Sequence, residues 1–197
     1  MDLTDPRLTA ALEERARTGR FQGELTFIRK DGTSFPGEVS TVIFRDHDSR
    51  QKTSMIVRDM SEKRKREQDY QSLFREMLNG FAVHEIICDP RGNPVDYRFL
   101  TVNPAFERIT GLKAEHIVGR TVLEVLPDTE PYWIETYGHV ALTGEPTLFE
   151  DYSKALNKYF VVTAFQSAPN QFACNFIDIT ERKRAEVELQ AIKAQLS

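Results

Sequence analysis

A ten-residue phrase that occurs twice constrains the architecture of this chain more than any other feature. Residues 56–65 read IVRDMSEKRK, and residues 175–184 read NFIDITERKR. Each copy runs from an apolar, strand-like stretch through Asp-x-Ser/Thr-Glu into a basic segment typical of a helix. The two aspartates, Asp59 and Asp178, are 119 residues apart, which is about the length of one small domain. The chain is therefore predicted to contain two copies of one unit.

Two further landmarks repeat in the same order at an offset of 125 residues. Asp-Pro at 5–6 corresponds to Glu-Pro at 130–131, and Thr-Gly at 18–19 corresponds to Thr-Gly at 143–144. If the second unit begins near Ser72, its partner would begin about 47 residues before the first residue of the chain. We therefore expect the first unit to lack its front half and the chain to be a piece of a longer polypeptide. Such a fragment has an unpaired sheet edge, so residues 20–59 are expected to lie against another surface.

The composition is that of an ordinary globular sequence. Among 197 residues, 40% are hydrophobic and 28% are charged, which suits one complete domain and a partial one. No apolar run approaches the roughly 20 residues that span a bilayer, and the N-terminus has no signal-peptide pattern. Cys88 and Cys174 are too few for a disulfide framework and too far apart for a CxxC motif. We expect a cytoplasmic protein without a membrane span.

The charge pattern does not favour a nucleic-acid partner. The net charge is −4, and the basic runs 63–66 and 182–184 lie at predicted helix starts among glutamates. We interpret them as solvated helix faces.

The first unit is predicted to be one helix followed by a three-stranded meander. Asp5-Pro6 is a helix-start signal, and the helix should stop at Gly19. Strands are expected at about 21–29, 34–45 and 52–59. In the middle strand one face should carry Phe35, Gly37, Val39, Thr41 and Ile43.

The second unit is predicted to be α+β, with a five-stranded antiparallel sheet and helices on one face. A helix from Ser61 leads into it, and its apolar stripe of Tyr70, Leu73, Phe74, Met77 and Leu78 should be buried. The expected strands are 81–88, 95–102, 147–154, 158–166 and 171–178. The expected helices are 104–110, 114–118 and 131–142.

These residues resemble those of a known family. Residues 103–111, followed by Gly119-Arg120 and Leu-x-x-Leu-Pro at 123–127, are similar to the core of a PAS domain. Residues 178–182 resemble the exit motif of that family, and residues 23–62 resemble its C-terminal portion, often called PAC. The resemblance implies a partial PAS domain at 1–60, a connecting amphipathic helix at 61–79, a complete PAS domain at 80–180 and an output helix at 181–197.

In this family small molecules lie between the inner sheet face and the helices. The residues expected to line such a pocket are Phe81, Val83, Phe99, Phe106, Ile117, Trp133, Tyr137, Val161, Thr163, Phe172 and Cys174. The same residues would serve as plain core, which is the interpretation that we favour, since no polar group is placed against them. An unidentified small-molecule ligand stays open.

No cofactor or metal is predicted. Haem needs an axial ligand, and His139 is the only histidine in the region where haem-binding relatives carry theirs. A photoactive flavin site would need an Asn-Cys-Arg-Phe-like motif where this chain has residues 111–115. His47, His84 and His116 show no metal-ligand spacing, and His84 is expected to be hydrogen-bonded or exposed.

The repeated phrase itself is a candidate for signal transfer. Asp59 and Asp178 lie two residues before the predicted helix caps Ser61 and Thr180. A carboxylate there favours a helix N-terminus by about 0.5 kcal/mol. The resemblance implies that this turn passes movement of the sheet to the outgoing helix.

No catalytic role is predicted, because the chain has no phosphate-binding glycine loop and no nucleophile elbow.

The last helix carries Ala185, Leu189, Ile192 and Leu196 at coiled-coil spacing, which predicts a homodimer through the linker and output helices. The resemblance implies a sensory or relay module whose downstream effector would be a histidine kinase or a diguanylate cyclase. Two alternatives are a ligand-free dimerisation and spacer module and a haem- or flavin-binding redox or gas sensor.

Overall fold

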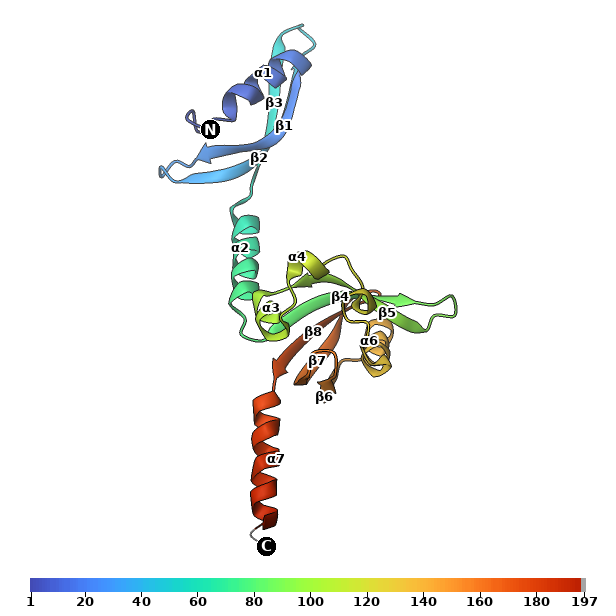
Figure 1. Cartoon of the computed structure of the whole chain (residues 1–197). Coiled ribbons are helices and arrows are strands. Elements are labelled where there is room, and N and C mark those ends of the chain that lie inside the picture. Colours follow the sequence, from blue (N-terminus) through green and yellow to red (C-terminus); the bar gives the residue numbers. More distant parts are fainter. Residues whose placement is uncertain (196–197) are drawn as a thin grey trace. The chain divides into compact units, whose positions relative to one another are not determined.

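The computed structural model describes residues 1–195, which form two compact units. The first unit is Met1–Gln71, and the second begins at Ser72. Figure 1 shows the elements of each unit. The predicted coiled-coil position Leu196 lies outside the described residues.

The first unit consists of one helix and an antiparallel meander in the order β1-β2-β3. Its elements are α1 (Leu8–Thr18), β1 (Arg20–Ile28), β2 (Ser34–Arg45) and β3 (Gln51–Asp59). The helix begins two residues later than predicted, because the carboxylate of Asp5 binds the backbone N–H of Arg7 and of Thr26 and holds the 5–7 segment in a turn. It ends as predicted at Gly19, whose φ of 75° favours glycine.

The predicted alternation of β2 is confirmed. Gly37, Val39 and Thr41 are buried, and Phe35 and Ile43 are half-buried on the same face. The core of this unit consists of Leu8, Ala11, Leu25, Phe27 and Val39. Val42 and Phe44 lie on the other face of β2 and remain exposed. α1 thus covers one face of the sheet and leaves the other open.

The helix α2 (Ser61–Glu76) runs from the first unit into the second. It is three residues shorter than the predicted 61–79 helix, and within residues 1–195 none of its side chains is buried. Leu73 is 71% exposed and Leu78 is 84% exposed, whereas Phe74 and Met77 are half-buried. Within the described chain the stripe is therefore not fully buried, and its burial against a further surface stays a prediction. Phe74 contacts Phe81 edge-to-face with ring centroids 5.9 Å apart.

The second unit has the predicted five-stranded antiparallel sheet, in the order β5-β4-β8-β7-β6. Its strands are β4 (Gly80–Cys88), β5 (Pro94–Val102), β6 (Thr147–Ser153), β7 (Lys158–Ala168) and β8 (Gln171–Asp178). Its helices are α3 (Pro104–Thr110), α4 (Ala114–Ile117), α5 (Val122–Val125), α6 (Pro131–Thr143) and α7 (Thr180–Gln195). The short helix α5 is not among the predicted elements, and a capping box between Thr121 and Glu124 starts it.

The sheet edges differ between the units. In the second unit β8, the last strand of the meander, pairs with both β7 and β4. The corresponding strand of the first unit, β3, pairs only with β2 among residues 1–195. The expectation that residues 20–59 lie against another surface therefore stays a prediction.

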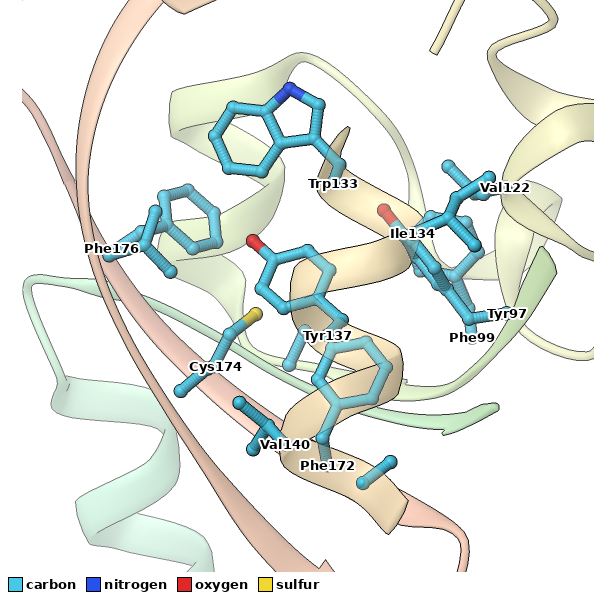
Figure 2. Packing of buried hydrophobic residues seen from close by; sticks show 14 of the residues in the cluster. Tyr97, Phe99, Val122, Trp133, Ile134, Tyr137, Val140, Phe172, Cys174 and Phe176 are labelled. Atoms are coloured by element: carbon cyan, nitrogen blue, oxygen red, sulfur yellow. The ribbon is translucent and has the colours of Figure 1, made fainter. Parts of the chain in front are cut away.

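Helix α6 covers the inner face of the five-stranded sheet, with side chains that point between those of β5 and β8 (Figure 2). The start of α3 is fixed by Asn103, which is fully buried. Its Oδ1 accepts from the N–H of Phe106 at 2.8 Å and of Phe81 at 2.9 Å, and its Nδ2 donates to the carbonyl of Asn79 at 3.0 Å. One side chain therefore caps α3 and joins it to β4.

Candidate functional site

A cavity of about 80 Å³ lies in the core of the second unit, between the inner sheet face and the helices. Most of its lining is aromatic or aliphatic, and among the described residues no Asp, Glu, Lys or Arg contributes to it. The lining residues are His84, Tyr97, Phe99, Phe106, Thr110, Leu112, Leu126, Thr129, Trp133, Tyr137, Ser153, Leu156, Phe160, Val162, Cys174 and Phe176.

Several of the residues predicted from the sequence lie at this cavity. Phe99, Phe106, Trp133, Tyr137 and Cys174 line it. Ile117 and Phe172 are buried in the surrounding core without lining the cavity itself.

The other four predicted lining residues are corrected by the structure. Phe81, Val83, Val161 and Thr163 lie on the opposite face of the sheet, because their neighbours in each strand are the buried ones. The error is one residue of register. Both strands are apolar at odd and even positions alike, so alternation in the sequence does not select a face.

The inward positions of β4 bring His84 into the lining, which the sequence analysis missed. The prediction that His84 is hydrogen-bonded or exposed is wrong: the residue is 2% exposed, and its Nδ1 is enclosed without a hydrogen-bond partner among residues 1–195. The ring stacks on Phe172 with centroids 4.6 Å apart and makes edge contacts with Tyr97 and Phe99. Burial lowers the pKa of His84 to about 3, so the imidazole is neutral at pH 7. The small residues Gly80 and Ala82, four and two positions earlier, are the signal that could have shown its orientation.

The remaining titratable side chains of the lining are also neutral. Burial raises the pKa of the Cys174 thiol to about 12. Burial likewise raises the pKa of Tyr97 and of Tyr137 above their ordinary values. The cavity is therefore uncharged at physiological pH.

The second candidate site is the turn between β8 and α7, at the repeated phrase. The carboxylate of Asp178 accepts from the N–H of Thr180 at 2.9 Å, and Thr180 Oγ1 accepts from the N–H of Tyr159 at 3.0 Å. Thr180 is thus the first residue of α7. The prediction that Thr180 caps this helix is wrong, because the Asp178 carboxylate binds the N–H at the start of the helix. Burial acts to raise the pKa of Asp178, but hydrogen bonds from Lys158 and Thr180 hold it below its ordinary value.

Lys158 connects this turn to the helical layer. Its Nζ lies 2.9 Å from Asp178 Oδ2 and donates to the carbonyl of Ile109 on α3 at 2.6 Å. On the outer side of the turn, Glu150 of β6 pairs with Arg182 at 2.6 Å and with Lys183 at 2.8 Å. The first turn of α7 is therefore tied to β6, to β7 and, through one lysine, to α3.

The first copy of the phrase repeats the local geometry with a different cation. Asp59 accepts from the N–H of Ser61 at 2.8 Å, and Ser61, like Thr180, is the first residue of its helix and does not cap it. Asp59 also pairs with Arg29, whose guanidinium lies 4.3 Å from the ring centroid of Phe35. Hydrogen bonds from Ser61 and then from Arg29 lower the pKa of Asp59 to about 2.

The helix α7 exposes apolar side chains along the described part of its length. Leu189 is 54% exposed and Ile192 is 48% exposed, and both lie on the predicted coiled-coil stripe. Val187 is 66% exposed and lies off that stripe.

Neither a membrane-spanning helix nor a metal-binding cluster is present among residues 1–195. No helix in this range is long and apolar enough to cross a membrane. No group of three or more His, Cys, Asp or Glu side chains in the same range is placed to hold a metal ion.

Comparisons with known proteins give one family. Two profiles described as PAS domain match the chain, one over residues 2–62 and the other over residues 68–143. No curated protein matches the chain in sequence.

Three solved structures illustrate the similarity in fold. The PAS domain of an HTR-like protein from Haloarcula marismortui is 19% identical, with a TM-score of 0.42, over 60% of this chain and 98% of that one. A domain of a sensory box sensor histidine kinase/response regulator from Geobacter sulfurreducens is 16% identical, with a TM-score of 0.42, over 60% and 99% of the two chains. An RNA-binding light-oxygen-voltage receptor is 11% identical, with a TM-score of 0.43, over 96% and 84%.

Proposed function

Because this chain belongs to the PAS domain family, with one match in each of its two units, we propose that it is a sensory and relay module. In this proposal the second unit receives a small molecule in its cavity and passes the resulting change to α7. The observation that carries the proposal is the contact of Lys158 with both Asp178 and the carbonyl of Ile109. One side chain thus joins the start of α7 to the helix that lines the cavity.

The route has two steps within the second unit. Phe106 and Thr110 of α3 line the cavity, and Ile109 lies between them in sequence. A ligand that displaces α3 changes the position of the Ile109 carbonyl and hence the ion pair of Lys158 with Asp178. That ion pair holds the first turn of α7. The ion pair of Lys158 with Asp178 is charge-assisted and partly buried, so it is either formed or broken. A contact with two distinct states can pass a change from one site to another.

The first unit has an ion pair at the corresponding turn, between Asp59 and Arg29. We propose that α2 is the outgoing helix of the first unit and the incoming helix of the second. The downstream effector, a histidine kinase or a diguanylate cyclase, belongs to the proposal and would follow α7 in a longer protein. The proposed setting is the cytoplasm.

Hydrogen exchange tests the relay. We expect Lys158→Met to speed amide exchange in the first turn of α7 and at the end of α3, because both lose their shared partner. Lys154→Met is the matched control, since the side chain of Lys154 lies in the neighbouring turn and makes no ion pair with the described residues. Exchange in α7 that is the same in both variants would contradict the relay.

The alternative, a ligand-free dimerisation and spacer module, is favoured by the exposed Leu189 and Ile192. Native and denatured mass spectrometry of the purified chain separate the two functions. A small molecule that is retained in the native state supports sensing. A chain that dimerises and shows no ligand-dependent change in α7 supports the spacer.

A further inference from the structure

The two copies of the unit differ most at the strand that precedes the repeated phrase. With the offset of 119 residues, Met55 and Val57 of β3 correspond to Cys174 and Phe176 of β8. Those two residues of β8 are buried, and they pair with β4. In β3 every residue except Val57 is exposed, although Met55, Ile56 and Val57 form an apolar run. The side of β3 that faces away from β2, the β3 edge, is therefore covered in one copy and open in the other.

The backbone groups of the β3 edge are free to form a further ladder. The N–H of Met60 donates to the carbonyl of Pro36 on β2 at 2.9 Å. Because backbone groups of successive strand residues point to opposite sides, Thr53, Met55 and Val57 direct their N–H and carbonyl groups away from β2. No other strand among the described residues pairs with this side of β3.

The β3 edge also lacks features that close a sheet edge. The strand contains no proline, and it pairs with β2 in one continuous register without a bulge. The opposite edge strand, β1, is closed at Thr26, whose carbonyl accepts from the N–H of Asp2 and whose N–H donates to the carboxylate of Asp5. A long apolar edge without such protection is a template for another strand.

Two cations flank the apolar run on the face of the sheet opposite α1. The side chain of Lys52 is 57% exposed and lies 2.9 Å from Asp46, and that of Arg58 is 78% exposed and lies 3.7 Å from Glu38. A carboxylate directly opposite an exposed cation stabilises a pair of neighbouring strands. The charges of β3 therefore favour a partner strand with an acidic residue near one end.

The second unit shows what kind of segment fits such an edge. β4 runs antiparallel to β8 and places Ala82 opposite Cys174 and Glu85 opposite Gln171. In the same register, a strand on β3 would have its small residue opposite Met55 and its acidic residue opposite Lys52. The pattern of β4 is thus complementary to β3 in both shape and charge.

We propose that the β3 edge binds an extended segment of a partner polypeptide as an added antiparallel strand. The segment is mostly apolar, carries small residues on the face that α1 covers, and carries an acidic residue opposite Lys52. Main-chain hydrogen bonds to Thr53, Met55 and Val57 provide the binding, and side chains at alternate positions provide the selectivity. This surface belongs to the first unit and goes beyond the proposed relay.

A fluorescein-labelled peptide with the sequence of residues 79–87 is the probe, and fluorescence anisotropy measures its binding to the whole chain. In β4 the N–H of Ile86 donates to the carbonyl of Asn170, so the N–H groups of even-numbered residues face β8. N-methylation of the peptide at the positions of Ala82 and His84 should therefore weaken binding at least about tenfold. N-methylation at the positions of residues 83 and 85 is the matched control and should leave binding nearly unchanged.

Amide exchange followed by NMR locates the bound peptide. The N–H groups of Thr53, Met55 and Val57 should exchange more slowly when the peptide is present. Those of Ser54 and Ile56 point to β2 and should exchange as before. Slower exchange in β8 with none in β3 would place the peptide in the second unit and overturn the proposal.

A charge exchange tests the chemistry of the partner. Lys52→Glu should weaken the peptide about two- to fivefold, and a peptide with Glu85→Lys should recover the loss. Lys30→Glu, at an exposed position of the turn between β1 and β2, is the control and should not alter binding. Circular dichroism establishes that both variants are folded. A Lys52→Glu variant that binds both peptides as the unchanged chain does would contradict the acidic position.

The remaining outcomes also decide the proposal. A peptide that does not bind, or that binds equally well with either set of N-methyl groups, overturns strand addition. Protection of Thr53, Met55 and Val57 without any peptide, lost on dilution, would assign the β3 edge to a second copy of the chain and overturn the proposed partner. Each of these results leaves the relay in the second unit standing.

Discussion

Gly138 of α6 lies so close to Pro94 of β5 that a Cβ atom at Gly138 would be 2.1 Å from the Cγ of Pro94. Gly138 is in a helix interior, where glycine is less favourable than alanine by about 1 kcal/mol. The close approach of α6 to the sheet explains why glycine is present. It also sets the depth at which Trp133 and Tyr137 enter the core.

We predict that Gly138→Ala destabilises the second unit by about 1–3 kcal/mol, because the clash with a rigid proline ring outweighs the gain in helix propensity. Urea unfolding followed by Trp133 fluorescence measures this. Glu135→Ala, at an exposed position of the same helix, is the control and should change stability by less than about 0.5 kcal/mol. A stabilised Gly138→Ala variant would show that α6 can move away from β5.

Asn103 carries a larger energetic role than an ordinary helix cap. Its Oδ1 serves two backbone N–H groups, and only one of them belongs to α3. We predict that Asn103→Ala costs about 2–4 kcal/mol, from a lost cap and an unsatisfied N–H of Phe81. The control is Thr121→Ala, which removes the cap of the short helix α5 and should cost about 1 kcal/mol. Equal losses in the two variants, measured by Trp133 fluorescence in urea, would contradict the second role of Asn103.

Acid should destabilise the first unit through Asp5. The Asp5 carboxylate is almost fully buried and accepts hydrogen bonds from Arg7 and from the N–H of Thr26, and the hydrogen bonds from Arg7 hold its pKa well below the ordinary value. A carboxyl with a folded-state pKa below its unfolded value of about 3.9 stabilises the fold above that pH, and its contribution is lost as pH falls.

The unfolding of the first unit should therefore shift to lower urea concentration below about pH 4. Circular dichroism follows both units and Trp133 follows only the second, so the transition seen by circular dichroism alone belongs to the first. Asp5→Asn should be less stable than the unchanged chain at pH 7, and the difference should shrink as pH falls. A constant difference between pH 7 and pH 3 would show that the Asp5 charge has no role.

Secondary-structure elements were predicted correctly where the residue pattern allowed only one interpretation. The repeated Asp-x-Ser/Thr-Glu phrase located both strand-to-helix turns, and Asn103 to Gly111 located α3 with its cap and stop. The strand β2 alternated clearly because Glu38 and Ser40 separate its apolar positions.

The cavity was predicted less well, for a physical reason. β4 and β7 are apolar on both faces, so Phe81 and Val161 were assigned inward while Ala82, His84 and Val162 are the buried neighbours. The burial of His84 without a partner depends on three strands converging on one ring. Spacing along a single strand carries no information about such a contact.

The coiled-coil prediction is tested by substitutions on α7. Leu189 and Ile192 lie on the predicted stripe, and a helix of about two heptads is marginal alone, so their exposure favours association through α7. We expect the chain to dimerise in size-exclusion chromatography with light scattering. Leu189→Asp with Ile192→Asp should weaken the dimer at least tenfold, because each substitution replaces an apolar side chain that the coiled coil would bury with a charge. Val187→Asp introduces the same charge off the stripe and should leave the dimer intact. A dimer that survives both stripe substitutions would place the interface elsewhere, and a chain that is monomeric at high concentration would remove the coil as the output route from the second unit.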